Sequence, residues 1–283
     1  MRRSGSALLA AALLCISTTT ASAGDRPPGA LPDAVVATGE GPVRRAWLAE
    51  PTERYPHGVL GDAIEAGALM AELAGGRILG IRLSDETVFE DRHVRLADFN
   101  GDGVDEMVVV ESHLEHGAAL AIYGIREGRI QLVLRDAWIG QANRWLNPAG
   151  IADFDGDGRL EIAIVVTPHI GGTLKLLRPG VKGFETVASL PGYSNHAIGS
   201  REQGLSFVAD VDGDGVADLI LPKNGRRSLQ ALRFAGGPPA VLDSETLPAA
   251  LTGALSAATG PDGALVVRAP VEGGTVVEWR PAP

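Results

Sequence analysis

The chain has 283 residues and is acidic, with 35 Asp and Glu against 25 Lys and Arg and a formal net charge of −10 at pH 7. This acidity disfavours a nucleic-acid partner, because nucleic acids attract basic surfaces. The 37 glycines and 18 prolines favour many turns over long helices. Length and composition together indicate turn-rich β structure in one large domain or two small ones.

The N-terminus has the three parts of a signal peptide in order. Two arginines follow the first methionine, an apolar run covers residues 7–16, and small residues occupy 21–23. We expect residues 1–23 to be removed and the mature protein to be secreted or periplasmic. The apolar run is too short for a permanent anchor, so no membrane insertion is expected. Cys15 is the only cysteine, so we expect no disulfide or thiolate ligand after cleavage.

Residues 24–44 form a segment that precedes the expected repeats. Within it, residues 34–37 are a candidate strand that closes a ring by pairing with the last repeat. A first, degenerate repeat is expected from residue 45, because residues 46–49 (Ala-Trp-Leu-Ala) resemble residues 137–140 (Ala-Trp-Ile-Gly) and both lie the same distance before an aspartate. In the first repeat this aspartate is Asp62, and the other acidic positions are lost, so no metal is expected there.

Three acidic segments align without gaps at residues 98–106, 153–161 and 210–218, and their first aspartates are 55 and 57 positions apart. Each has Asp, Asn or Glu at positions 1, 3, 5 and 9 and glycine at position 6. An apolar, β-branched run follows each segment, which is typical of a buried strand. A period near 55 residues with several short strands is typical of four-stranded propeller blades.

The last repeat is fainter and has room for only three strands, at residues 254–259, 264–268 and 275–280. We therefore predict an all-β fold in which residues 45–283 form one β-propeller domain. Five four-stranded blades are expected, with blade boundaries near residues 45, 91, 146, 203 and 248.

The acidic loops have the chemistry of calcium sites. Alternate residues of a tight loop can point inward together, and their oxygens, with a backbone carbonyl at position 7, suit a hard cation. An EF-hand would need a glutamate at position 12 and flanking helices, but position 12 is Val109, Ile164 or Leu221, each within an apolar run. We expect about three Ca²⁺ ions. The expected ligands are Asp98, Asn100, Asp102, Val104 and Glu106; Asp153, Asp155, Asp157, Arg159 and Glu161; and Asp210, Asp212, Asp214, Val216 and Asp218.

With these loops the chain resembles the FG-GAP or VCBS repeat family, which includes the propeller of integrin α subunits. The resemblance covers about residues 45–247 and is strongest where acidic residues stand at positions 1, 3, 5 and 9. The first and last repeats depart from the family pattern. The resemblance implies a β-propeller with calcium in these loops, and it implies no single activity.

Strand order assigns the acidic loops to one face of the disc and all six histidines to the other. Arginine and tryptophan from the segments that link the blades can converge on this second face, and pockets of this kind often bind ligands. We therefore expect a monomeric binding or adhesion module for a carbohydrate or protein ligand, and an anionic or sugar-like ligand fits the residue types best. The candidate ligand-binding residues are His113, Arg144, Trp145, Asn147, His169, His196 and Arg201.

Two alternatives remain open. His113 and His116 with Glu111 or Glu115 suit a transition metal, or acid and base in a lyase-type reaction on an acidic sugar. The chain has no nucleophile elbow, zinc-binding helix or phosphate-cradling loop, so a binding protein is favoured over an enzyme. A purely structural or assembly role is the other alternative.

Overall fold

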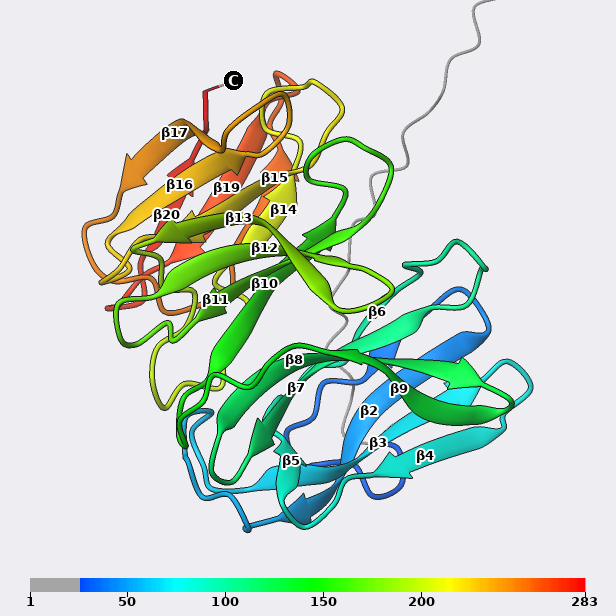
Figure 1. Cartoon of the computed structure of the whole chain (residues 1–283). Coiled ribbons are helices and arrows are strands. Elements are labelled where there is room, and N and C mark those ends of the chain that lie inside the picture. The colour runs from blue at the N-terminus through cyan, green and yellow to red at the C-terminus, as the bar shows by residue number, and fades with distance from the viewer. Residues whose placement is uncertain (1–25, 283) are drawn as a thin grey trace, which may run out of the picture.

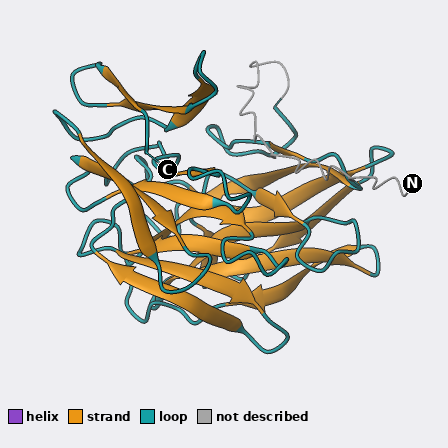
Figure 2. Cartoon of the chain, turned by 90° about the horizontal axis from the view of Figure 1, so that it is seen from above, coloured by secondary structure: helices purple, strands orange, loops and turns teal. Residues whose placement is uncertain are grey.

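The computed structural model describes residues 26–282, so the predicted signal peptide lies outside the described residues. Within this range every regular element is a strand (Figure 2), which confirms the predicted all-β class. None of the described residues forms a helix of the length and apolar character needed to cross a membrane.

The first nine strands form one antiparallel sheet, in the order β1-β2-β3-β5-β7-β8-β9, with β4 beside β3 and β6 beside β7. Its unusual member is β5, which pairs with both β3 and β7 and thereby joins two groups of strands. The strands are β1 (Ala37–Thr38), β2 (Val43–Thr52), β3 (Glu65–Leu73), β4 (Ile78–Arg82), β5 (Thr87–Phe89), β6 (Arg95–Ala97), β7 (Glu106–His113), β8 (Gly117–Arg126) and β9 (Arg129–Arg135).

Three further antiparallel sheets follow in chain order and lie above the first sheet in Figure 1. The second sheet contains β10 (Leu146–Ala152), β11 (Glu161–Val166), β12 (Thr173–Pro179) and β13 (Phe184–Pro191). The third contains β14 (Phe207–Ala209), β15 (Asp218–Pro222), β16 (Ser228–Arg233) and β17 (Ala240–Thr246). The last contains β18 (Ser256–Thr259), β19 (Leu265–Pro270) and β20 (Val276–Trp279), the three strands expected there from the sequence.

The sheets pack on one another through both faces of their inner strands. Successive side chains of a strand point to opposite faces, so an apolar run can serve two cores. In β11, Ile162 packs with Val108 of the first sheet, whereas the next residue, Ala163, packs with Leu219 of the third. The third and last sheets share a separate cluster. This double packing explains why the strands after the acidic loops are continuously apolar.

Four buried polar side chains join the sheets where they meet. The side-chain amide of Gln203 donates to Asp91 Oδ1 at 3.0 Å and to Asn147 Oδ1 at 3.3 Å. In turn, Asn147 donates to the carbonyls of Asn195 and Gln203 at 3.1 Å, and Asn195 donates to the carbonyl of Asn147. Each of these residues is less than 5% exposed. We call Asp91, Asn147, Asn195 and Gln203 the polar hub.

The expected closure by residues 34–37 is wrong. Val35 pairs with His93, and Ala37 pairs with Ala46 of β2, so this segment belongs to the first sheet. The edge of β2 is only a few residues away, so pairing with it closes a much shorter loop than pairing with the far end of the chain. The sheets do not close into a ring among residues 26–282, and the five-bladed propeller stays a prediction.

The expected alignment of the first repeat is also corrected. Residues 46–49 lie inside β2, whereas residues 137–140 lie in the connection between β9 and β10. The shared Ala-Trp pair is therefore a local likeness. Asp62 lies in the β2–β3 loop, at the opposite strand ends from the acidic loops, and it pairs with Arg201 at 2.7 Å.

We predict that Gln203→Ala lowers the free energy of unfolding by about 2 kcal/mol or more, because it leaves the buried Oδ1 of Asn147 without a donor and removes one of the donors to buried Asp91. Exposed Gln141→Ala is the matched control and should change stability by less than about 0.5 kcal/mol. Denaturant titration at fixed calcium concentration measures both variants. Equal stabilities would show that the hub does not hold the sheets together.

Candidate metal loops and the histidine face

The three acidic loops connect β6 to β7, β10 to β11 and β14 to β15, at the strand ends on the right of Figure 1. In the second loop, Asp153 accepts the backbone N–H groups of Gly156 and Gly158, each at 2.8 Å. Both glycines have positive φ, 76° and 89°, which the tight turn requires and which other residues seldom adopt. Asp98 and Asp210 accept the corresponding N–H groups of their own loops.

The acidic residue at position 9 is buried and ties the start of each loop to the strand that follows. One oxygen of Glu161 accepts the backbone N–H of Phe154 at 3.0 Å. The same bond recurs between Phe99 and Glu106 at 3.1 Å and, in the third loop, between Val211 and Asp218 at 2.8 Å. The acidic side chains Glu106, Glu161 and Asp218 are at most 2% exposed. The loops therefore share one backbone frame, as the repeat in the sequence predicts.

Two of the loops gather three carboxylates that can hold a metal ion. In each cluster the oxygens of positions 1, 3 and 9 lie within 4.8 Å of one another. Three carboxylate oxygens form a hard donor set, which fits calcium. The clusters are Asp153, Asp155 and Glu161 in the second loop, and Asp210, Asp212 and Asp218 in the third. In the first loop position 3 is Asn100, whose side-chain amide donates to Glu106 at 2.8 Å.

The expected ligands at positions 5 and 7 lie differently. The position 5 carboxylates are exposed, and each accepts the backbone N–H of position 7 within its own turn. They are not members of the two clusters. These residues are Asp102, Asp157 and Asp214 at position 5, and Val104, Arg159 and Val216 at position 7.

Crowded carboxylates raise one another's affinity for protons. The pKa of Asp218 rises to about 6, first because of burial and then because of the nearby charges of Asp212, Asp214 and Asp210. Burial also raises the pKa of Glu161, although Arg178 opposes the change. Without a cation, the loops therefore hold charges that repel one another.

The contact of Arg178 with the carboxylates of the second loop was not predicted from the sequence. Equivalent contacts join Arg126 to Glu106 in the first loop, at 3.1 Å, and Arg233 to Asp212 in the third, at 3.3 Å. Each arginine lies at or next to the end of the third strand of its repeat. An arginine that ends an apolar run in every repeat is the signal that would have revealed them.

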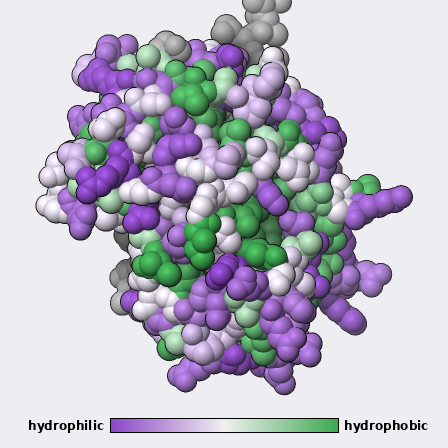
Figure 3. Space-filling model, turned by 60° about the vertical axis from the view of Figure 1, so that its left-hand side comes forward, coloured by the Kyte–Doolittle hydropathy of each residue, from purple (hydrophilic) through white to green (hydrophobic). Residues whose placement is uncertain are grey.

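All six histidines lie at the strand ends opposite the acidic loops, as expected. They occur at the end of β7, in the β2–β3, β7–β8 and β11–β12 loops, and in the segments before β6 and β14. We call this side the histidine face. The left-hand side of Figure 1, where the β7–β8 turn lies, comes forward in Figure 3, which shows apolar surface near its centre within a polar surround. The histidines are His57, His93, His113, His116, His169 and His196.

His169 and His196 form a neutral pair beside Trp145. The His196 Nε2–H donates to the carbonyl of Ser200 at 3.0 Å, so its Nδ1 accepts from His169 Nε2–H at 2.9 Å. Burial lowers the pKa of His169 to about 4, and the charge of Arg226 adds to this. Burial, and then His169, lower the pKa of His196 to about 3. Both imidazoles are therefore uncharged at pH 7.

A cavity of about 430 Å³ opens beside this pair. Its polar lining includes His169, Ser194, Asn224 and Arg226, and its apolar lining includes Ile198, which is 72% exposed. Arg226 has one donor, Nε, that is buried without a hydrogen-bond partner among the described residues, while its Nη1 donates to the carbonyl of His196. The cavity thus combines one guanidinium with neutral polar groups.

Three of the expected ligand-binding residues are corrected by their burial. Trp145 is 2% exposed, and Asn147 and His196 are 0% exposed. The Trp145 Nε1–H donates to the carbonyl of Glu90 at 2.9 Å, and Asn147 belongs to the polar hub. They shape the interior and are unavailable for direct contact with a ligand. Arg144 is half-buried and does not line the cavity.

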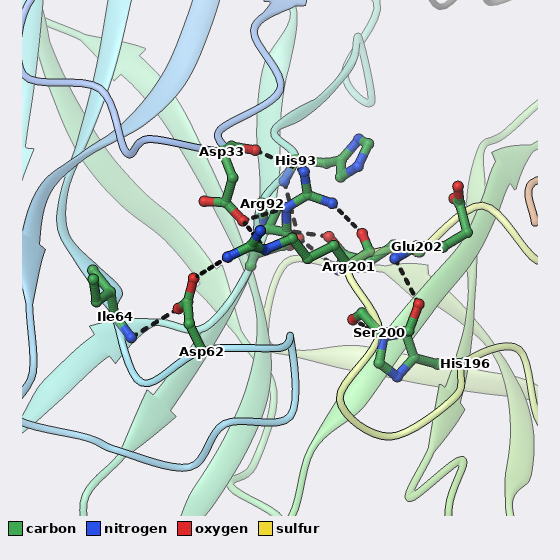
Figure 4. A network of polar contacts seen from close by, with 11 residues as sticks. Asp33, Asp62, Ile64, Arg92, His93, His196, Ser200, Arg201 and Glu202 are labelled. Atoms are coloured by element: carbon green, nitrogen blue, oxygen red, sulfur yellow. Dashed lines mark hydrogen bonds and ion pairs between the residues drawn. The ribbon is translucent and has the colours of Figure 1, made fainter.

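Arg201 binds other parts of the chain. It pairs with Asp62 at 2.7 Å and with Asp33 at 3.4 Å, and Asp33 also pairs with Arg92 at 2.7 Å (Figure 4). Arg92 further donates to the carbonyl of Arg201. These ion pairs connect the segment before β14 to the first sheet. The structure therefore gives Arg201 a role in joining sheets.

Of the residues expected as acid and base for a lyase, Glu111 and His113 line one cavity, between β7 and its neighbours. Glu111 is fully buried, and its two oxygens accept the Tyr123 hydroxyl and the Arg135 guanidinium. His113 and His116 stack with ring centroids 4.5 Å apart. Glu111 is therefore already paired within the sheet.

Residues 98–164 match the family model of the FG-GAP-like repeat, which confirms the predicted resemblance for this part of the chain. The search of curated proteins found no match. Among solved structures, a Bacillus licheniformis rhamnogalacturonan lyase is 16% identical with a TM-score of 0.44, covering 74% of this chain and 48% of its own. Rhamnogalacturonan lyase YesW is 14% identical with a TM-score of 0.45, and the match covers 73% of this chain and 44% of YesW. The exotype rhamnogalacturonan lyase YesX is 15% identical with a TM-score of 0.47, and the match covers 87% of this chain and 54% of YesX. The chain spans about half the length of these structures.

We predict that the protein loses stability as the pH falls below about 6.5, because unfolded histidines are protonated there while folded His169 stays neutral to about 4. His169→Gln removes this titration. The free energy of unfolding of the variant should therefore fall less steeply with falling pH, and its slope should be smaller than that of the wild type by up to about 1.4 kcal/mol per pH unit. Denaturant unfolding at pH 7.5 and pH 5.0, at one calcium concentration, tests this. Parallel pH profiles for wild type and variant would contradict it.

Proposed function

We propose that this protein is an exported, monomeric calcium-binding module, and that its sheets are the blades of a β-propeller. The FG-GAP-like repeat and the succession of antiparallel sheets support the architecture. Calcium would be held in all three acidic loops, with side-chain oxygens of positions 1, 3 and 9 as ligands, where position 3 is an amide in the first loop and a carboxylate in the other two. The ion would supply positive charge that offsets the repulsion among these carboxylates, so binding would stabilise the folded state.

We further propose that the module binds a carbohydrate or protein ligand through an anionic group at the cavity of the histidine face. The observation that carries this proposal is Arg226, which lines the cavity and has a buried donor without a partner. A buried, unused donor gains a hydrogen bond when an acceptor arrives, and a guanidinium prefers carboxylate or phosphate. Asn224 and Ser194 add neutral polar groups, and Ile198 adds apolar surface.

The calcium count tests the first part. Calorimetric titration of the wild-type protein should give about three Ca²⁺ ions. Replacing Asp153 and Asp155 by alanine should remove one ion and leave the other two, because each loop has its own ligands. Absence of heat specific to calcium, or the same count in the double variant, would refute the assignment.

The cavity is tested with uronic-acid oligosaccharides and their neutral counterparts. We expect the acidic oligosaccharides to bind preferentially, and Arg226→Met to weaken binding by about 1 to 3 kcal/mol, as loss of an anchoring side chain does. Arg227→Met removes the same charge from the exposed neighbour, which does not line the cavity, and should bind like wild type. The calcium count should be unchanged in both variants. Equal losses in both would place the site elsewhere.

A further inference from the structure

The second loop already contains a cation from the chain itself. Arg178, at the end of β12, contacts the carboxylates of Asp155, Asp157 and Glu161, the last at 2.8 Å. Its side chain is only 10% exposed, and Glu161 is fully buried. The guanidinium therefore lies among the acidic groups at positions 3, 5 and 9 of the loop.

This contact uses the oxygen that a metal ion would need. One oxygen of Glu161 accepts the backbone N–H of Phe154, and the other accepts the Nε–H of Arg178. Both oxygens of the position 9 carboxylate are thus engaged within the protein. A cation that took Glu161 as a ligand would have to displace the guanidinium or share the carboxylate with it.

The three loops differ in how many of their carboxylates an arginine contacts. In the first loop Arg126 pairs with one carboxylate, that of Glu106, and its side chain is 40% exposed. Both oxygens of Glu106 are also engaged, one by Phe99 N–H and the other by Arg126 and the Asn100 amide. In the third loop Arg233 contacts Asp212 at 3.3 Å and does not contact the position 9 carboxylate, Asp218. The Oδ1 of Asp218 accepts no hydrogen bond from any described residue. The third loop also has four carboxylates, because position 3 is aspartate, whereas the first loop has Asn100.

We infer that Arg178 is an internal counterion that competes with calcium, so that the third loop fills at low calcium concentration and the second only at higher concentration. The inference rests on the proposed calcium function. A guanidinium near three carboxylates stabilises the metal-free loop, and that stabilisation must be given up when a divalent ion enters. Arg178 therefore sets the calcium affinity of its loop.

The experiment compares Arg178→Met with Arg159→Met. Both variants lose one positive charge near the second loop, but the Arg159 side chain is 63% exposed and pairs only with Asp157. Position 7 is expected to bind calcium through its backbone carbonyl, which Arg159→Met keeps. Calorimetric calcium titration should resolve the step that disappears in the Asp153→Ala, Asp155→Ala double variant. We expect Arg178→Met to raise the affinity of that step by about tenfold or more, and Arg159→Met to raise it by about threefold at most.

Thermal unfolding in excess chelator provides a second readout. Arg178→Met should lower the melting temperature of the metal-free protein more than Arg159→Met does, and saturating calcium should remove the difference. Arg178→Gln, which keeps a donor for Glu161 without the charge, serves if the methionine variant fails to fold. An unchanged or lower affinity of the second step in the Arg178 variants overturns the inference. If wild type and variants alike bind no calcium, the proposed function itself fails.

Discussion

The buried amides of Asn147 and Gln203 are the constraint on which the arrangement of the sheets depends. Each amide has donors and acceptors that must be satisfied away from water, and the partners come from segments far apart in the chain. An apolar contact would tolerate sliding of one sheet over another, whereas these bonds permit one relative position. The cavity beside His169 and the ion pairs of Arg201 lie in the same region, so the hub also fixes their geometry.

Alternation of strand direction separates the two kinds of chemistry in the molecule. The acidic loops occupy one set of strand ends, where backbone N–H groups and internal arginines balance their charge. The opposite ends carry the neutral pair His169 and His196, paired arginines and the cavity lined by Arg226. The proposed metal loops and the proposed ligand cavity therefore lie on different surfaces of one scaffold.

The sequence predicted the parts that depend on local pattern. The acidic loops, the apolar strands after them and the three strands of the last sheet follow from spacing and alternation. Two kinds of feature escaped this reasoning. The pairing of Ala37 with Ala46 depends on which edge is nearest in space, and a likeness between two Ala-Trp pairs gave the wrong register. The second feature is burial. Trp145 was expected on the ligand face, but neighbours from other parts of the chain cover it, and the sequence around Trp145 does not show them.

The short strand β5 gives the chain an uneven mechanical character. Because Thr87–Phe89 pairs with both β3 and β7, the first nine strands share one continuous hydrogen-bond network. The later sheets have separate strand ladders, which are joined by side chains and by a few backbone hydrogen bonds, such as that from Ser194 N–H to the carbonyl of Pro222 at 3.0 Å. Under pulling force or partial denaturation, the first nine strands should yield as a single cooperative unit, while the last sheet, which has three strands and one neighbour, should detach first.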